Sequence, residues 1–373
     1  MRLAWFRPAT QVSERLDDTA ALVADLRSDH EIECFDQSRA PDFVRLDFRR
    51  QFDVSVFELA DTEQHAFVWP YLLHYPGVLR LRSLSLHESR SASLRRQRQS
   101  GDRAAELAFS QYELLGAPLL ASRLAVVSDP HLAASLQRDY PRARLRFAPI
   151  GLGSEWGQSR GQSWGQSRGQ SRGLTPGLTP IGTLARMSLV RRAVDRANYA
   201  GARLELLTDT SPERVFADAE IVVDLEWPAS GEQATTLAAM AAGKPIIVLE
   251  TERTARWPAL DPQTWRPRGL PGEQPIVVSV DPRDEEHSLS LALRRLGEDE
   301  GLREALGTAA HAWWRTHATV AHAADAWREI LRDAASLAPP PRPADWPAHL
   351  TADGTERARQ ILGELGTGVD FVR

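Results

Sequence analysis

The chain has 373 residues, which is enough for two ordinary domains and too long for one compact core. Hydrophobic residues make up 42% of it and charged residues 25%, as in globular proteins, and the formal net charge of −5 argues against a general nucleic-acid-binding protein. The single cysteine, Cys34, excludes an internal disulfide and zinc sites built from Cys-x-x-Cys pairs, so we expect no metal or other cofactor. No run of about 18 apolar residues is present, and we expect a cytoplasmic protein.

The first 150 residues alternate short runs typical of β-strands with longer segments of helical spacing. The predicted strands are Arg2–Phe6, Ile32–Phe35, Val54–Leu59, Val78–Leu81, Leu124–Ser128 and Leu145–Ala148. The predicted helices are Ser13–Leu26, His65–Leu73, two within Ser85–Leu115, and His131–Arg138. Strands that alternate with helices form parallel sheets through right-handed crossovers, so residues 1–152 predict one doubly wound α/β domain.

A segment of low complexity follows. The sequence Gly157-Gln158-Ser159-Arg160 recurs three times up to Arg172, once with Trp164 in place of arginine, and Gly173–Pro176 is repeated at Gly177–Pro180. The repeats are rich in glycine and serine and have no apolar face. They predict a flexible linker over residues 153–180.

The alternation of strands and helices resumes after the linker. The predicted strands are Ile181–Leu184, Leu204–Leu207, Ile221–Leu225, Pro245–Leu249 and Ile276–Val280. The predicted helices are Leu189–Asn198, Ser211–Ala217, Gln233–Ala242, Ser288–Leu296, Gly301–His317 and Val320–Ala335. Residues 181–336 therefore predict a second α/β domain, with ligands at the carboxyl ends of its strands. A proline-rich tail with a short helix is expected over residues 337–373.

The order of motifs in the first half resembles the family 4 glycosyltransferases of the GT-B architecture. The strand Val54–Leu59 is followed by His65, then by Tyr75-Pro76-Gly77 ahead of the next strand, and then by His87. The resemblance implies two Rossmann-like doubly wound domains that face each other across a cleft, the first binding the acceptor. It makes Ser13, His65 and His87 acceptor-side candidates and His87 a catalytic candidate, although either histidine could instead be structural.

The second half carries Trp227–Glu232 and then Leu237–Pro245, which resemble the donor-site signature of the same family. In that signature a turn bearing glycine and glutamate opens a helix that ends in Ala-Ala-Gly-Lys-Pro. The start of such a helix would aim free N–H groups at a diphosphate and stabilise the charge that gathers on this leaving group. An ordinary helix start is the alternative. The donor-binding candidates are Arg186, Arg191, Ser230, Gly231, Glu232 and Gln233, and Glu232 is also a catalytic candidate.

Several positions depart from the family pattern. The family has two glutamates separated by seven residues across the donor turn, and the aligned positions hold Ser230 and Ala238. Alanine cannot accept hydrogen bonds from a ribose, so this donor contact is absent. The family's His-Asp after the fourth strand is replaced by Arg82-Ser83. No motif decides which arginine near residues 186–192 would bind phosphate, and Arg186 comes soonest after the predicted strand.

These features predict a glycosyltransferase that moves a hexosyl group from a nucleotide-diphosphate sugar to a polysaccharide, lipid or other glycan acceptor, with retention of configuration as the resemblance implies. The altered positions leave an alternative, a catalytically degenerate GT-B protein that acts as a binding or scaffold module. Five arginines within Arg90–Arg103 suggest weak peripheral contact with anionic lipid at the inner face of a membrane, and a solvated helix face is the other interpretation. No nucleic-acid partner is expected.

Overall fold

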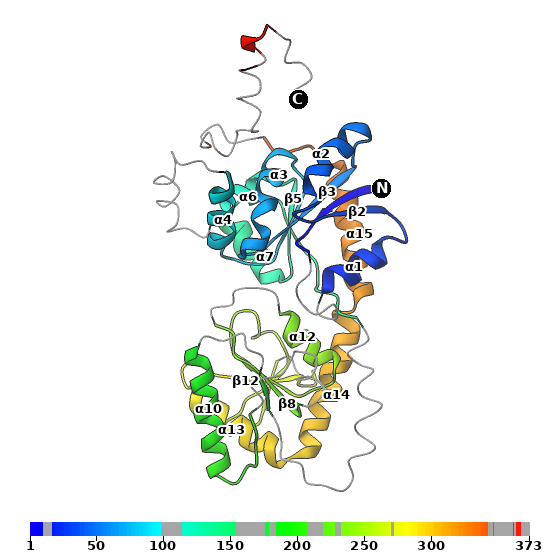
Figure 1. Cartoon of the computed structure of the whole chain (residues 1–373). Helices are drawn as coiled ribbons and strands as arrows, with labels where there is room; N and C mark the ends of the chain where they lie inside the picture. Colours follow the sequence, from blue (N-terminus) through cyan, green and yellow to red (C-terminus); the bar gives the residue numbers. More distant parts are fainter. Residues whose placement is uncertain are drawn as a thin grey trace. The chain divides into compact units, whose positions relative to one another are not determined.

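The computed structural model describes residues 1–9, 17–97, 114–153, 176–178, 184–206, 219–227, 233–269, 272–341, 346, 361 and 363–366. The described part of the chain divides into two compact units. The first contains Met1–Ala9, Asp29–Phe147 and the chain from Glu329 onward, and the second contains the segments 10–28 and Ala148–Arg328. Each unit is built around a six-stranded sheet with helices on its faces (Figure 1). Ser13 lies outside the described residues.

The sheet of the first unit is parallel throughout, in the order β2-β1-β3-β4-β5-β6. Its strands are β1 (Arg2–Phe6), β2 (Glu31–Phe35), β3 (Val54–Leu59), β4 (Val78–Leu81), β5 (Leu124–Val127) and β6 (Leu145–Phe147). All six strands predicted in this region are confirmed to within one residue at either end. The strand order reverses between β1 and β3, which makes the carboxyl edge of these strands the expected position of a ligand.

Aromatic side chains fill one face of this sheet. The Phe6 ring lies 5.2 Å from that of Phe35 and 4.8 Å from that of Phe57, centroid to centroid, and Phe43 meets Phe6 edge-on at 4.9 Å. The described helices of this unit are α2 (Ala40–Arg49), the 3₁₀ helix η2 (Glu63–Phe67), α3 (Val68–His74), α4 (His87–Gln97), α6 (Gly116–Ala121) and α7 (Pro130–Asp139). The sequence did not predict α2 or α6. Pro41 in the first turn of α2 is compatible with a helix start.

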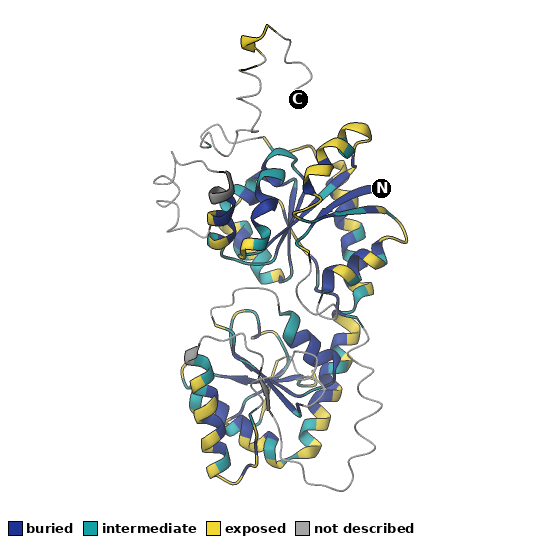
Figure 2. Cartoon of the chain, in the orientation of Figure 1, coloured by how far each residue is buried: buried dark blue, intermediate teal, exposed yellow. Residues whose placement is uncertain are grey.

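The second sheet has the order β11-β10-β12-β9-β8-β7, and only β10 and β11 pair antiparallel. Its strands are β7 (Pro176–Leu178), β8 (Ile221–Asp224), β9 (Ile246–Leu249), β10 (Ala259–Leu260), β11 (Pro267–Arg268) and β12 (Val277–Val280). The described helices of this unit are α1 (Asp18–Leu26), α10 (Leu184–Tyr199), α12 (Ala234–Ala241), α13 (Glu285–Glu298) and α14 (Glu300–His317). The last long helix, α15 (Val320–Ser336), begins in the second unit and ends in the first. Figure 2 shows buried strands inside each unit and exposed outer faces on the helices.

Two predicted strands of the second half extend outside the described residues, at 181–183 and at Leu207. Leu184, the last residue of the first of them, begins α10, and the strand β7 lies inside the predicted linker. Proline and glycine are rare in strands, which explains why β7 was missed, and proline is tolerated at the edge that β7 occupies among the described strands. In the predicted strand Leu204–Leu207, Leu204 forms a β-bridge, and the Asn198 amide bonds both its N–H and its C=O.

One of the five arginines of the predicted basic surface within Arg90–Arg103 does not lie on the surface. Arg90 is buried, and its guanidinium lies 4.9 Å from the centre of the Trp69 ring. It is therefore a packing residue of the first unit. Residues 98–113 are not among the described residues, so most of the predicted surface lies outside the described part of the chain. Within the described residues, no helix has both the length and the apolar character that crossing a bilayer would require.

Helix α12 ends in a glycine turn that the sequence Ala-Ala-Gly-Lys encodes. Gly243 has a φ of 66°, and the N–H of Lys244 bonds the carbonyl of Ala239 at 3.0 Å, which is the Schellman arrangement. Helix α14 crosses this turn so closely that a Cβ atom on Gly307 would lie 2.1 Å from the carbonyl oxygen of Gly243. The Nδ1 atom of His311, one turn further along α14, lies 2.8 Å from the carbonyl oxygen of Ala241.

We expect Gly307→Ala to lower the free energy of unfolding by about 1–3 kcal/mol, because the added methyl group must displace backbone atoms of the turn. Urea denaturation of the purified chain measures this. Gly301→Ala is the matched control in the same helix, since the nearest atom to its added Cβ would lie 3.7 Å away. Equal effects of the two substitutions would contradict the close packing at Gly307.

Candidate functional site

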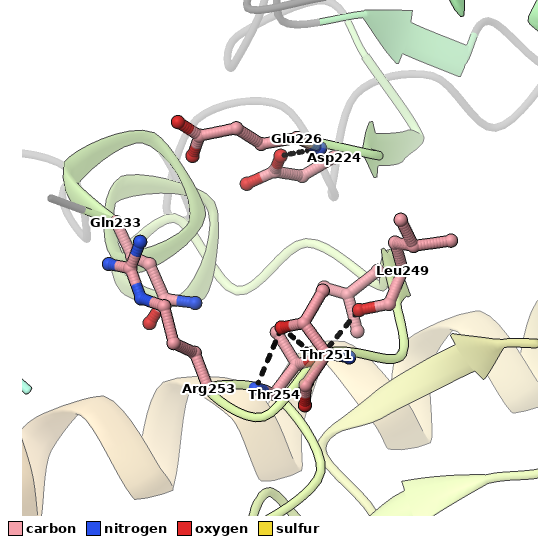
Figure 3. Close-up of a pocket in the computed structure, with 8 residues that line it drawn as sticks. Asp224, Glu226, Gln233, Leu249, Thr251, Arg253 and Thr254 are labelled. Carbon is pink, nitrogen blue, oxygen red and sulfur yellow. Dashed lines mark hydrogen bonds between the residues drawn. The ribbon is translucent and has the colours of Figure 1, made fainter. Parts of the chain in front are cut away.

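A pocket in the second unit opens at the carboxyl ends of β8 and β9, beside the start of α12 (Figure 3). Doubly wound sheets bind ligands at this edge, because the strands stop there and leave the loops and helix starts exposed. The residues that line the pocket are Asp224, Glu226, Gln233, Val248, Leu249, Thr251, Arg253 and Thr254. The lining combines two carboxyl groups, one guanidinium, one amide and two hydroxyl groups with a small apolar surface.

Asp224 is the inner carboxyl group of the pocket. It is the last residue of β8, and its two oxygens accept hydrogen bonds from the backbone N–H of Glu226, at 3.2 Å, and from the hydroxyl of Thr236. Burial raises the pKa of Asp224, and the nearby Glu226 carboxylate raises it further, while the hydrogen bond from Thr236 acts in the opposite direction. The bond from Thr236 links the Asp224 side chain to the first turn of α12.

The loop after β9 forms the opposite wall. The Thr254 hydroxyl donates to the carbonyl of Leu249 at 2.6 Å, and the Thr251 N–H donates to the Thr254 hydroxyl at 2.8 Å. These bonds fold the loop back on the end of the strand. Figure 3 shows Arg253 extending from this loop toward Gln233, with Asp224 and Glu226 on the other side of the pocket.

The structure places one predicted donor residue in this pocket. Gln233 lines it and is the residue directly before α12, where its side chain makes no capping hydrogen bond. Ser230, Gly231 and Glu232 lie outside the described residues. Ala238 is completely buried within α12 and carries no polar group, as the sequence indicates.

The two predicted phosphate-binding arginines are not part of the pocket lining. Arg186, in the first turn of α10, forms an ion pair with Glu285 in the first turn of α13, with 2.5 Å between Nη1 and Oε2. Glu286 pairs with two further arginines of α10, Arg192 at 2.7 Å and Arg196 at 3.0 Å. These ion pairs join the two helices. Arg191 is exposed, two turns into α10.

The first unit has a polar cluster of its own at the carboxyl edge of β3. Asp61 accepts hydrogen bonds from the Ser85 hydroxyl at 2.8 Å and from the backbone N–H groups of Glu88 at 2.6 Å and Ser89 at 3.2 Å. The Asp61 carboxylate thus satisfies free amides at the start of α4 and fixes its first residue, His87. Neither Asp61 nor its role was predicted, although its position two residues after a predicted strand was a signal.

Beneath this cluster lies a buried carboxyl group. Glu58 is 2% exposed, accepts a hydrogen bond from Trp5 Nε1 at 2.7 Å, and pairs with Arg80 at 3.4 Å and Arg82 at 3.3 Å. Because buried charges need partners, the two arginines and the indole make this carboxyl group compatible with the sheet interior. Arg82, which replaces a family motif in the sequence, therefore has a structural partner here.

His65 is held at the same edge. Its Nδ1 atom lies 2.8 Å from the Thr62 hydroxyl, and it belongs to η2, which packs against α4. The pKa of His65 is lowered to about 4, chiefly by burial, with the Glu58 carboxylate opposing the shift and the Arg82 guanidinium adding to it. The imidazole is therefore neutral at pH 7 and can accept a hydrogen bond. His65 in η2 and His87 in α4 therefore belong to two helices that pack against each other.

Stability should fall in acid because of His65. Its pKa is near 6.5 in an unfolded chain and about 4 in the native state, so the unfolded state binds more protons between these values. We expect its contribution, about 1–3 kcal/mol, to be present above pH 6.5 and lost as the pH falls to 4. Urea denaturation of the wild type and of His65→Asn across this range measures it.

A matched control is His322→Asn. His322 makes the same hydrogen bond to a threonine three residues earlier, Thr319, at 2.6 Å, but it is exposed. This control removes an exposed imidazole and shows how much of any change in the pH profile comes from the substitution itself. A wild type and a His65→Asn variant with parallel pH profiles would contradict a neutral, buried His65.

No protein-family model matches the chain, and no curated protein sequence does. Solved structures do match. HepE of Anabaena, in complex with UDP and glucose, is 12% identical with a TM-score of 0.56, over 89% of this chain and 100% of that one. Sucrose-phosphate synthase of Thermosynechococcus elongatus is 13% identical with a TM-score of 0.59, over 89% and 98%. The catalytic domain of starch synthase IV of Arabidopsis thaliana, bound to ADP and acarbose, is 12% identical with a TM-score of 0.55, over 90% and 99%.

At these identities the comparisons establish the fold. Each match covers nearly all of both chains, so both Rossmann-like units are included in the similarity. The chain has the GT-B fold of the nucleotide-sugar glycosyltransferases.

Proposed function

We propose that this chain is a glycosyltransferase that moves a hexosyl group from a nucleotide-diphosphate sugar to a polysaccharide, lipid or other glycan acceptor. The observation that carries the proposal is the polar pocket at the carboxyl ends of β8 and β9, beside the start of α12, in a GT-B fold. Structures of that fold were solved with UDP, with UDP-glucose and with ADP. In this proposal the reaction retains the anomeric configuration and uses no metal or other cofactor.

The pocket has the chemistry that a leaving diphosphate needs. Helix α12 begins at its wall, and the first amides of a helix and its dipole favour an anion. Arg253 adds a full positive charge from the loop after β9. These groups stabilise negative charge that grows as the glycosidic bond to the diphosphate breaks, so they stabilise the transition state more than the ground state.

The acceptor is assigned to the carboxyl edge of β3 in the first unit. His65 and His87 lie there, and the neutral imidazole of His65 can accept a hydrogen bond from an acceptor hydroxyl group. This assignment needs no protein nucleophile. The alternative of a scaffold that binds nucleotide without turnover is favoured by one observation, the buried and uncharged Ala238 in α12.

Isothermal titration calorimetry of the full chain with UDP, ADP and GDP tests the donor site. We expect at least one of them to bind, and Arg253→Ala to weaken that binding about ten-fold or more, because a charge-assisted contact to phosphate is lost. Arg256→Ala is the matched control, because Arg256 is exposed on the same loop and does not line the pocket. If none of the three nucleotides bound, the proposed function would be wrong.

Turnover separates the transferase from the scaffold. Release of nucleoside diphosphate from UDP- and ADP-sugars, measured with polysaccharide and glycolipid acceptors, should exceed the rate without protein and should fall in Arg253→Ala. Nucleotide binding without release from any donor would instead support the scaffold.

A further inference from the structure

A buried threonine lies directly after Arg253, the residue that we assign to the diphosphate. Thr254 is 7% exposed and belongs to the loop after β9. Its hydroxyl donates to the carbonyl of Leu249, the last residue of β9, at 2.6 Å, and accepts from the N–H of Thr251 at 2.8 Å. One hydroxyl group therefore ties the loop both to the end of the strand and to the first residue of the turn (Figure 3).

The two threonines of this loop form a reciprocal pair. The Thr251 hydroxyl accepts from the N–H of Thr254 at 3.3 Å, while the Thr254 hydroxyl accepts from the N–H of Thr251. This is the arrangement of a capping box, in which the first residue of a helical turn and the residue three positions later cap each other's amides. The carbonyl of Thr251 also accepts from the N–H of Ala255 at 2.9 Å, so the box closes one helical turn around Arg253.

The orientation of this turn decides which charge faces the pocket. Arg253 lines the pocket, whereas its neighbour Glu252 is exposed and does not line it. Neighbouring residues of a helical turn point about 100° apart. A turn rotated by about one residue would therefore bring the Glu252 carboxylate toward the site of a diphosphate and move the Arg253 guanidinium away. Because a carboxylate repels phosphate and a guanidinium binds it, anion binding depends on this orientation.

An ion pair holds the loop less firmly than the threonine does. Glu250, the residue before Thr251, pairs with Arg268 of β11, but these two side chains are 38% and 41% exposed. Solvent screens exposed ion pairs, so they constrain a loop weakly. The bonds of Thr254 are largely buried, and the loss of its hydroxyl would leave the Leu249 carbonyl without this donor. The hydroxyl is therefore the stronger constraint on the turn.

We propose that Thr254 is a positioning residue of the donor site, whose hydroxyl holds the turn after β9 so that Arg253, and not Glu252, faces the diphosphate. This inference rests on the proposed donor function. Thr254 acts through Arg253, because its own hydroxyl group is already bonded within the loop.

Calorimetry of the full chain with UDP, ADP and GDP tests this inference. For the nucleotide that binds, we expect Thr254→Val to weaken the affinity about ten-fold, nearly as much as Arg253→Ala, because the guanidinium loses its direction. Thr254→Ser keeps the hydroxyl and should retain the wild-type affinity to within about two-fold. In the double variant the two losses should not add, since both substitutions remove the same contact.

A matched control is Ser122→Ala. The Ser122 hydroxyl is also buried and donates to a backbone carbonyl at the same distance, 2.6 Å to Pro118, but it belongs to the first unit and does not line the pocket. This control should lower the free energy of unfolding as Thr254→Val does and leave the nucleotide affinity unchanged. Thr254→Ala serves as a second variant without the hydroxyl if valine prevents folding, which circular dichroism detects.

The outcomes separate the two proposals. A Thr254→Val variant with wild-type affinity, a Thr254→Ser variant as weak as Thr254→Val, or fully additive losses in the double variant would each overturn the role of Thr254 and leave the donor function standing. An equal loss of affinity in Ser122→Ala would also overturn it, because the loss would then be a general effect of destabilisation. A wild type that binds no nucleotide at all would overturn both proposals.

Discussion

The contact between Gly243 and Gly307 fixes the position of α12, and the start of this helix forms one side of the pocket. No side chain fits between the turn after α12 and the middle of α14, and His311 contacts the carbonyl of Ala241 from the next turn. The carboxyl end of α12 is thereby held against α14, and the run of buried alanines allows the helix to lie close to the sheet. The start of α12 then falls at the ends of β8 and β9, where the polar side chains converge.

The two units handle buried charge differently, and this difference matches the roles that we assign to them. In the first unit, Glu58 is enclosed by Trp5, Arg80 and Arg82, and this cluster sets the electrostatic surroundings of His65. In the second unit, Asp224 accepts hydrogen bonds from two neutral donors, the backbone N–H of Glu226 and the hydroxyl of Thr236. The first arrangement keeps an imidazole neutral, and the second holds a carboxyl group at the start of α12.

Much of the fold could be predicted from the sequence, because apolar runs mark buried parallel strands. The strands of the first unit, and β8, β9 and β12 of the second, appear at the predicted positions. Strand β7 could not be predicted, since Pro176-Gly177 resembles a turn and its strand conformation depends on pairing with β8. The glycine turn after α12 was visible as Ala-Ala-Gly-Lys, but the reason for Gly307, a contact with a turn far away in the sequence, was not.

The candidate site could be predicted only in part. Gln233 was identified from its place at a helix start, whereas Asp224 and Glu226 were missed, although Asp224 lies near the end of the predicted strand Ile221–Leu225 and Glu226 follows it directly. Arg253 carries no sequence signal, because its direction depends on how Thr251 and Thr254 fold the loop. The pairing of Arg186 with Glu285 joins residues from two distant helices, and no pattern of spacing reveals it.

The start of α12 has a consequence for how the protein would respond to a ligand. The helix has eight residues, about 12 Å in length; its far end is held by close packing and by the glycine turn, and Thr236 in its first turn bonds Asp224. The Gln233 side chain makes no capping bond, so a bound anion would serve as an acceptor for the first amides. Ligand binding would then complete the helix, and protection of these amides from hydrogen exchange would report occupancy of the pocket directly.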